Sequence, residues 1–96
     1  MVNKKSEMDW DAISYVISSE LRLKVLIHLT KKASTPTKIS EKLGEPISRV
    51  STALRELSEI KAIKCLTPDR RKGKIYYATE KGKKIIEILH EMTDIR

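Results

Sequence analysis

Four basic side chains occupy five consecutive positions of this sequence, Arg70-Arg71-Lys72-Gly73-Lys74. They lie in a stretch from Lys61 to Lys84 that holds nine basic residues and two acidic ones, whereas the rest of the chain holds eleven of each. The formal net charge of +7 therefore belongs to this one stretch. Positive charge confined in this way produces a local field, and the partner with the densest negative charge is nucleic acid.

The basic cluster falls between two short runs of β-type residues, at 63–67 and 75–78. Pro68-Asp69 and Gly73 lie between the runs, which predicts a β-hairpin with the basic cluster at its tip. A solvated turn whose charges prevent edge-to-edge aggregation is the ordinary alternative, but it needs fewer charges. The tip residues that we expect to contact phosphate groups or the minor groove are Arg70, Arg71, Lys72 and Lys74.

A second polar group lies on a predicted helix over residues 47–60. The apolar positions of this helix recur three and four residues apart and predict a buried stripe of Ile47, Val50, Leu54, Leu57 and Ile60. The outer face is acidic in its second half, at Glu56 and Glu59, and polar and positive in its first half. Arginine can bind guanine through two hydrogen bonds, and Ser or Thr can contact bases or phosphates. The residues predicted to read the major groove are Ser48, Arg49, Ser51, Thr52 and Arg55. A solvated helix face remains the alternative for this helix taken alone.

Four further helices complete the predicted order. The first begins after Asp9 and ends near residue 18, the second follows a Ser cap and ends at residues 31–32, a short third helix covers 37–43, and the last runs from Thr79 to about residue 93. Gly44 is expected to end the short helix. Lys38, near the start of the short helix, could anchor a phosphate there, or it could be plain surface charge.

The order of helix, helix, short helix, turn, long helix, hairpin and helix predicts a fold class that is mainly α with a small β-hairpin (α+β), the winged helix-turn-helix. The second helix of the turn, residues 47–60, is then the recognition helix. We expect residues 1–8 to form a flexible tail and residues 9–96 to form one domain.

The terminal helices carry more apolar side chains than a small core can cover, so we expect a homodimer. One set of these side chains should be buried within the chain and the other should face a partner. The alternative is that the two helices cover each other within one chain. The candidate interface residues are Ile13, Val16, Ile17, Ile85, Ile88, Leu89 and Met92.

Other kinds of site find little support. His28 and His90 lie on different predicted helices without metal-ligand spacing, and the single Cys65 suits a reducing cytoplasm. We therefore expect no metal, no cofactor and no enzyme activity. The few aromatic residues argue against stacking on single-stranded nucleic acid. The first eleven residues are polar and no apolar run is long enough to span a bilayer, so neither a secretion signal nor a membrane anchor is expected.

Several segments resemble the ArsR-type and MarR-type winged-helix regulators. Residues 17–29 are similar to the second-helix signature of ArsR-type repressors, residues 36–44 to their short helix and turn, and residues 48–57 to their recognition helix. Residues 73–82 resemble the wing exit that both types share. The recognition helix lacks the paired cysteines of metal-sensing members, and the terminal helices are too short for a MarR-type effector pocket. The abundance of Lys and Ile suggests an archaeal source.

These observations together predict a cytoplasmic, sequence-specific regulator of transcription that binds double-stranded DNA as a homodimer. Two alternatives use the same fold. One is an architectural or chromatin protein with little sequence preference. The other is a winged helix that binds an acidic protein partner within a larger complex.

Overall fold

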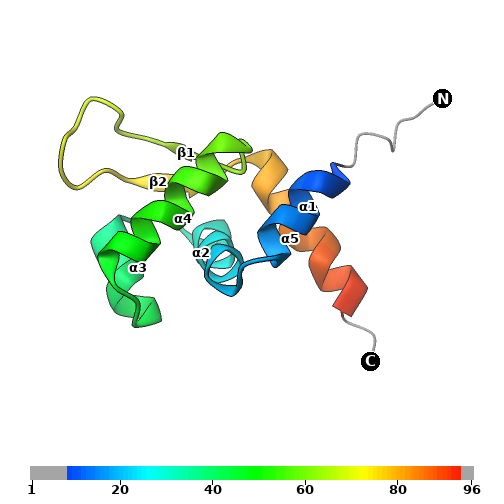
Figure 1. Cartoon of the computed structure of the whole chain (residues 1–96). Helices are drawn as coiled ribbons and strands as arrows, with labels where there is room; N and C mark the ends of the chain where they lie inside the picture. The colour runs from blue at the N-terminus through cyan, green and yellow to red at the C-terminus, as the bar shows by residue number, and fades with distance from the viewer. Residues whose placement is uncertain (1–8, 94–96) are drawn as a thin grey trace.

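The computed structural model describes residues 9–93, so the predicted tail over residues 1–8 lies outside the described residues. The chain forms five helices and one antiparallel two-stranded sheet over this range (Figure 1). The elements in order are α1 (Trp10–Ile17), α2 (Glu20–Lys31), α3 (Pro36–Leu43), α4 (Ile47–Glu59), β1 (Ile63–Cys65), β2 (Tyr76–Ala78) and α5 (Glu80–Thr93). The predicted fold class, mainly α with a small hairpin, is confirmed.

Side-chain caps set the helix starts. Asp9 accepts a hydrogen bond from the amide of Ala12 at 3.0 Å, and Ser19 accepts one from Arg22 at 3.2 Å. The predicted start of α3 at residue 37 was wrong, because Thr35 is the cap and Pro36 occupies the first helical position. Proline suits that position, since its missing N–H group would have had no partner there.

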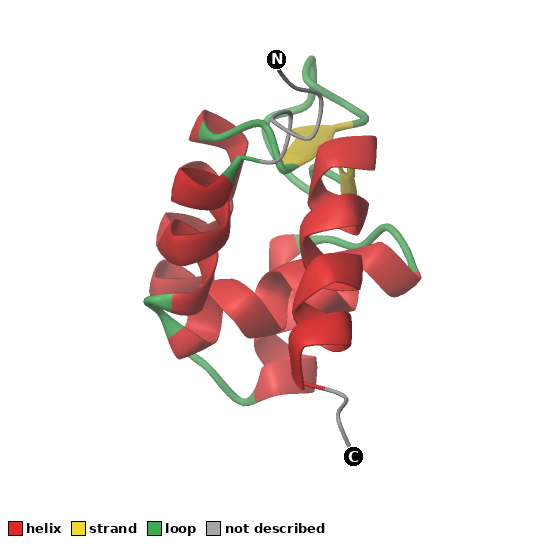
Figure 2. Ribbon diagram, turned by 90° about the vertical axis from the view of Figure 1, so that its right-hand side faces the viewer, coloured by secondary structure: helices red, strands yellow, loops and turns green. Residues whose placement is uncertain are grey.

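The core forms around α2, which packs against α1, α3, α4, α5 and β2 (Figures 1 and 2). Val25, Leu26 and Leu29 of α2 are buried at its centre. The predicted stripe of α4 is buried at Val50, Leu54 and Leu57. Ile60 is half-buried, and the prediction for Ile47 was wrong, because its side chain is 48% exposed. Ile47 is the first residue of the helix and lies beyond the edge of the core.

The hairpin has a shorter ladder than the sequence predicts. Strand β1 pairs with β2 through Ile63 with Ala78 and Cys65 with Tyr76. Beyond the ladder, the amide of Leu66 still donates to the carbonyl of Ile75 at 2.7 Å. An isolated bridge that the sequence did not indicate joins Ser34, between α2 and α3, to Tyr76. This bridge fixes the base of the hairpin to the start of α3.

The start of α5 packs closely against the turn that follows α4. Thr79 caps α5 by accepting from the amide of Gly82 at 3.2 Å, and its hydroxyl donates to the carbonyl of Lys61 at 2.8 Å. A β-carbon on Gly82 would lie 2.1 Å from the carbonyl oxygen of Ala62. Glycine is therefore required here for a close approach between two backbone segments.

The two terminal helices lie side by side at one end of the molecule, and the hairpin loop and α3 lie at the other (Figure 1). Asp9 and Lys81 form an ion pair of 3.0 Å between the start of α1 and the start of α5. Within the described range, no helix is both long enough and apolar enough to cross a membrane.

Candidate nucleic-acid interface

The first half of α4 presents a polar surface to solvent. A tight turn leads into it: Gly44 ends α3 with a φ of +69°, and the side-chain hydroxyl of Ser40 donates to the carbonyl of Glu45 at 2.5 Å. Pro46 then precedes a helix start that no side chain caps. The predicted contact residues on this surface are all exposed: Ser48, Arg49, Ser51, Thr52 and Arg55.

Each arginine of this surface forms a loose ion pair with a glutamate four residues away in the chain. Arg49 lies 3.8 Å from Glu45, and Arg55 lies 3.5 Å from Glu59. Exposed pairs of this kind contribute little free energy, about 0.3–0.5 kcal/mol on a helix. Either guanidinium group can therefore leave its partner for a base or a phosphate at small cost.

The partly buried guanidinium group of Arg22 holds the inner side of α4 against α2. The Nε atom of Arg22, on α2, lies 3.1 Å from Glu56 Oε1, and these side chains are only 11% and 24% exposed. The same group donates to the carbonyl of Tyr15 and to Ser18 Oγ, and its central carbon lies 3.8 Å from the centre of the Tyr15 ring. From the sequence, Glu56 was predicted only to belong to the acidic half of α4, and no role was predicted for Arg22. No local pattern reveals a pair of residues 34 positions apart.

The hairpin tip is open to solvent over residues 68–73. The amide of Arg70 donates to the carbonyl of Thr67, and its Nη1 atom donates to the carbonyl of Gly73 at 3.1 Å. Gly73 has a φ of +66°, which lets the chain turn back toward β2. Arg71 and Lys72 are exposed and Lys74 is half-buried.

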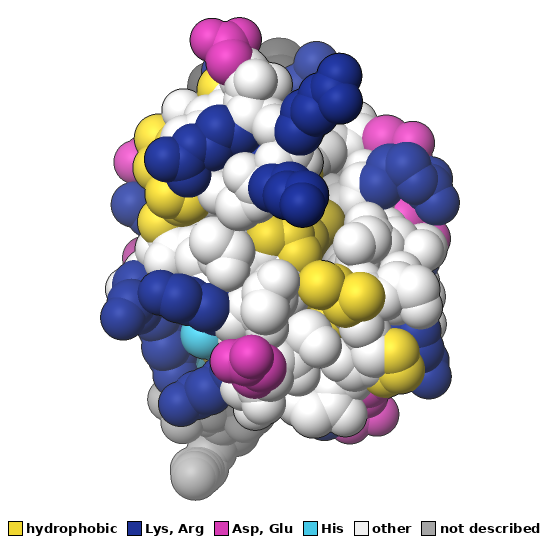
Figure 3. All heavy atoms as spheres, turned by 90° about the vertical axis from the view of Figure 1, so that its left-hand side faces the viewer, with side chains coloured by type: hydrophobic (Ala, Val, Ile, Leu, Met, Phe, Trp, Pro, Cys, Tyr) yellow, Lys and Arg dark blue, Asp and Glu magenta, His cyan; other side chains and the backbone are white. Residues whose placement is uncertain are grey.

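Basic side chains gather on the face that carries the hairpin loop and α3 (Figure 3). One group lies beside a histidine low on this face, which has an acidic side chain on its other side. Lys38 of α3 is exposed, and it lines a pocket together with His28, Lys32 and Lys42. The sequence indicates surplus charge only in the hairpin region, because acidic residues balance these lysines along the chain. In the structure, no acidic side chain lines this pocket.

Burial lowers the pKa of His28 from its ordinary value, and the neighbouring Lys42, Lys32 and Lys31 lower this pKa further. The direction agrees with a local excess of positive charge, because neighbouring cations disfavour protonation of an imidazole.

The terminal helices divide their apolar side chains between the core and the surface. Of the candidate interface residues, Ile13, Val16, Ile85 and Leu89 are buried in the chain's own core. Ile88 is partly buried against that core, whereas Ile17 and Met92 are about half exposed. Trp10, which was not among the candidates, is also exposed. The apolar surface left for a partner is therefore narrower than the sequence suggests: Trp10, Ile17, Ile88 and Met92.

The described residues contain no group of three or more His, Cys, Asp or Glu side chains that could hold a metal ion. Cys65 is half-buried in β1, with its sulfur 3.9 Å from Thr67 Oγ1. Burial raises the pKa of Tyr76, and the nearby Cys65 raises it further. Both side chains belong to the base of the hairpin rather than to its basic tip.

The chain is similar to several solved protein structures. No model of a protein family matches the sequence, and no curated protein matches it either. A ZitR variant from Lactococcus lactis is 31% identical with a TM-score of 0.67, over 78% of this chain and 54% of that one. The chain thus spans about half the length of ZitR.

Two further structures match along most of the chain. The transcriptional regulator HlyU from Vibrio vulnificus is 19% identical with a TM-score of 0.72, over 93% of this chain and 92% of HlyU. MepR from S. aureus, solved as a complex with DNA, is 19% identical with a TM-score of 0.72, over 94% of this chain and 76% of MepR. None of these structures supports the archaeal source that the composition suggested. The element order and these similarities together show that the chain has the winged helix-turn-helix fold.

Proposed function

We propose that this protein is a regulator of transcription that binds specific sequences of double-stranded DNA as a homodimer. The observation that carries the proposal is that the hairpin loop, α3 and the first half of α4 lie at the same end of the molecule (Figure 1). Duplex DNA is a partner that can contact a helix and a basic loop over such a surface at once. The similarity in fold to a structure solved with DNA supports the same conclusion.

The front of α4 enters the major groove in this proposal. Arg49 and Arg55 bind guanine edges through paired hydrogen bonds, while Ser48, Ser51 and Thr52 contact bases or phosphates. The acidic residues in the second half of α4 favour entry by the first half, because phosphate repels them. The α4 helix enters in a fixed orientation, since the Arg22–Glu56 pair holds it against α2.

The hairpin formed by β1, β2 and the loop between them is the wing of this fold, and in this proposal it follows the DNA backbone beside the major groove. Arg70, Arg71, Lys72 and Lys74 lie at or beside the exposed tip and contact phosphates or the minor groove. Lys38 adds a backbone contact from α3. These contacts supply affinity that does not depend on sequence, whereas the α4 front supplies specificity.

A second copy pairs through the terminal helices. The apolar side chains that the core leaves uncovered support this arrangement, and two-fold pairing would separate two recognition helices by about 34 Å, one turn of DNA. We place this activity in the cytoplasm, and we propose neither a cofactor nor a catalytic step.

The ratio of the affinities for specific and for unrelated DNA tests this function. The full chain is used to select duplexes from a random pool, and its affinity for a selected duplex is compared with that for a scrambled one in the same salt. We expect a ratio of at least about 10³. A ratio near one would favour the architectural alternative, and no binding to any duplex at moderate salt would favour an acidic protein partner.

A further inference from the structure

A pocket of about 300 Å³ opens between the end of α2, the start of α3 and the base of the hairpin. Its basic lining residues are His28 and Lys32 from α2 and the segment just after it, and Lys38 and Lys42 from α3. Ala33 and Ile75 form an apolar part of its wall. A neighbouring groove shares three of these side chains and adds Lys24 and Lys31, so the positive surface continues beyond the pocket.

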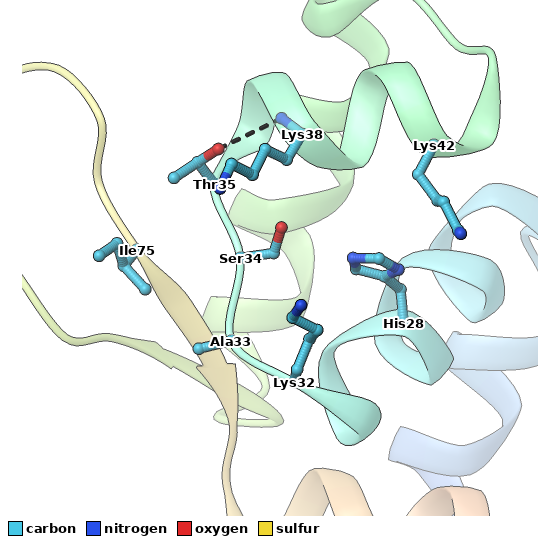
Figure 4. A pocket seen from close by; sticks show the side chains of 8 residues that line it. All are labelled: His28, Lys32, Ala33, Ser34, Thr35, Lys38, Lys42 and Ile75. Atoms are coloured by element: carbon cyan, nitrogen blue, oxygen red, sulfur yellow. Dashed lines mark hydrogen bonds between the residues drawn. The ribbon is translucent and has the colours of Figure 1, made fainter.

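The charges of this pocket are not neutralised within the described part of the chain. Lys32, Lys38 and Lys42 take part in none of the ion pairs found there. Figure 4 shows Lys32 pointing up toward the space between Ser34 and the His28 ring, Lys42 descending from α3 on the other side of that ring, and Lys38 running toward Thr35. The three lysines that line this pocket give it an excess of positive charge, which an anion bound there would offset.

Ser34 provides the observation that points to a ligand. Its residue is only 7% exposed, and both its backbone groups are bonded to Tyr76. Its side-chain hydroxyl has no hydrogen-bond partner among the described residues, and Figure 4 shows it directed into the space between α3 and His28. A hydroxyl that no protein group satisfies, and that faces a pocket lined by cations, is available to donate to an oxygen of a bound anion.

The start of α3 adds a weaker attraction. The positive end of a helix dipole favours an anion, and Thr35 lines the pocket at this end. The amide of Lys38 is already bonded to Thr35 Oγ1 at 3.2 Å, and Pro36 has no amide hydrogen. The site therefore depends on the Ser34 hydroxyl and the lysine side chains more than on the helix end.

We propose that this pocket is a binding site for a phosphate-type oxyanion. A phosphate dianion carries twice the charge of a carboxylate, and its oxygens point in several directions, so it can meet the Ser34 hydroxyl and lysine ammonium groups from different walls of the pocket. The phosphate can belong to a small phosphorylated molecule or to the backbone of a bound duplex. The proposal does not rest on DNA binding, because the pocket and its lining are complete in the free chain.

Titration of the full chain with inorganic phosphate, followed by ¹H–¹⁵N NMR at constant ionic strength, tests the proposal. We expect saturable shifts centred on the amides of Ser34 and Thr35, together with a rise in the pKa of His28. Ser34→Ala and Lys38→Ala should each weaken phosphate affinity about tenfold, the effect of one hydrogen bond to a charged group. Lys84→Ala removes an exposed lysine of α5 and is the matched control, which should keep the parent affinity.

The stability of the Ser34→Ala variant separates binding from structure. If the hydroxyl serves only a bound anion, its removal should leave the phosphate-free protein about as stable as the parent, because no hydrogen bond to another described group is lost. Shifts that do not saturate, or that persist unchanged in Ser34→Ala, would show an adventitious ion only and would overturn the proposal.

Competition with a duplex identifies the source of the phosphate. If saturating phosphate and Ser34→Ala both weaken duplex binding at constant ionic strength, the pocket holds a backbone phosphate. If neither does, the site serves a small phosphorylated molecule. Failure of the phosphate titration would leave the proposed DNA binding standing, and failure to bind DNA would leave the phosphate titration unaffected.

Discussion

Arg22 joins three helices through one guanidinium group. It bonds to Glu56 on α4, stacks on the Tyr15 ring of α1 and donates to the backbone at the end of α1. At the scale of single residues, the proposed interface therefore depends on a side chain that lies behind it. The arginines that face solvent on α4 have only loose partners, so they are free to exchange those partners for DNA.

Replacement of Arg22 by Ala should lower the free energy of unfolding by about 2 kcal/mol, because Glu56 loses a charged partner in a half-buried position. Urea denaturation of the two proteins measures the difference. Arg55→Ala removes an exposed arginine from a pair on the same helix and should cost less than about 0.5 kcal/mol. Equal losses in the two variants would show that the Arg22 contacts are no more stabilising than a surface pair.

Replacement of Arg49 or Arg55 by Ala tests base reading. If the arginine binds a guanine edge, its removal should weaken the binding free energy by about 1–3 kcal/mol on the selected duplex and by less on scrambled DNA. Fluorescence anisotropy with both duplexes at one salt concentration measures the two losses. Similar losses on both duplexes would mean that these side chains contact only the backbone.

At the scale of elements, the helices and the hairpin could be predicted because each has a local signal. Asp9, Ser19 and Thr79 cap helices at the expected places, and Gly44 ends α3. The bridge from Ser34 to Tyr76 could not be predicted, because its partners lie far apart in the chain and neither belongs to a recognisable pattern.

The candidate contact residues, like the elements, could be predicted where a local pattern marks them. The hairpin tip and the front of α4 follow from charge and helical spacing, and the structure exposes both. Of the basic pocket, the sequence indicated Lys38 as a possible phosphate anchor, but not that His28 and Lys32 join it, because these residues come from α2 and the segment after it. Burial of Ile13 and Val16 depends on how α1 packs in three dimensions, which helical spacing alone does not determine.

Gly82 tests the packing of α5 against the turn after α4. Helix propensity alone predicts that Gly82→Ala stabilises α5 by about 1 kcal/mol. The added methyl group would instead collide with the carbonyl oxygen of Ala62, so we expect a loss of about 1–3 kcal/mol. Thermal unfolding gives the sign, with the exposed neighbour Lys83→Ala as the control. A stabilised Gly82→Ala protein would show that α5 can move away from Ala62 at no cost.

The wing should act through charge alone. Replacement of Arg70 and Arg71 together by Ala should weaken binding about equally on all duplexes, and it should flatten the slope of log K against log salt by about 1 to 2. Anisotropy titrations at four or more salt concentrations give that slope. If slope and affinity both stay at the parent values, the tip is a solvated turn.

At the scale of the whole molecule, the two ends have different surfaces. Basic side chains gather at the end with the hairpin loop and α3, where Ile47 and Leu66 are also exposed (Figures 1 and 3). The terminal helices at the other end expose Trp10, Ile17 and Met92. This division suits a dimer that pairs through one end and binds DNA with the other. The alternative, in which the terminal helices only cover each other, accounts for the buried residues but not for Trp10, Ile17 and Met92.

Light scattering at tens of micromolar tests the dimer. We expect a mass near twice the 11.0 kDa of one chain. The double variant Ile17→Glu, Met92→Glu places charges on the exposed apolar surface and should be monomeric. The monomers should bind DNA far more weakly, because the binding free energies of two half-sites no longer add. Leu66→Glu changes an equally exposed apolar residue of the hairpin and should remain dimeric. A parent mass near that of one chain would contradict the dimer.

In the proposed function, this protein recognises particular DNA sequences through the first half of α4. A genome-wide binding map of the tagged full chain, compared with the map of a tagged Arg49→Ala, Arg55→Ala double variant, tests this recognition. We expect discrete sites that share one two-fold symmetric motif in the parent map and lose that motif in the variant. Even coverage of the genome in both maps, or no enrichment in either, would contradict the proposed function.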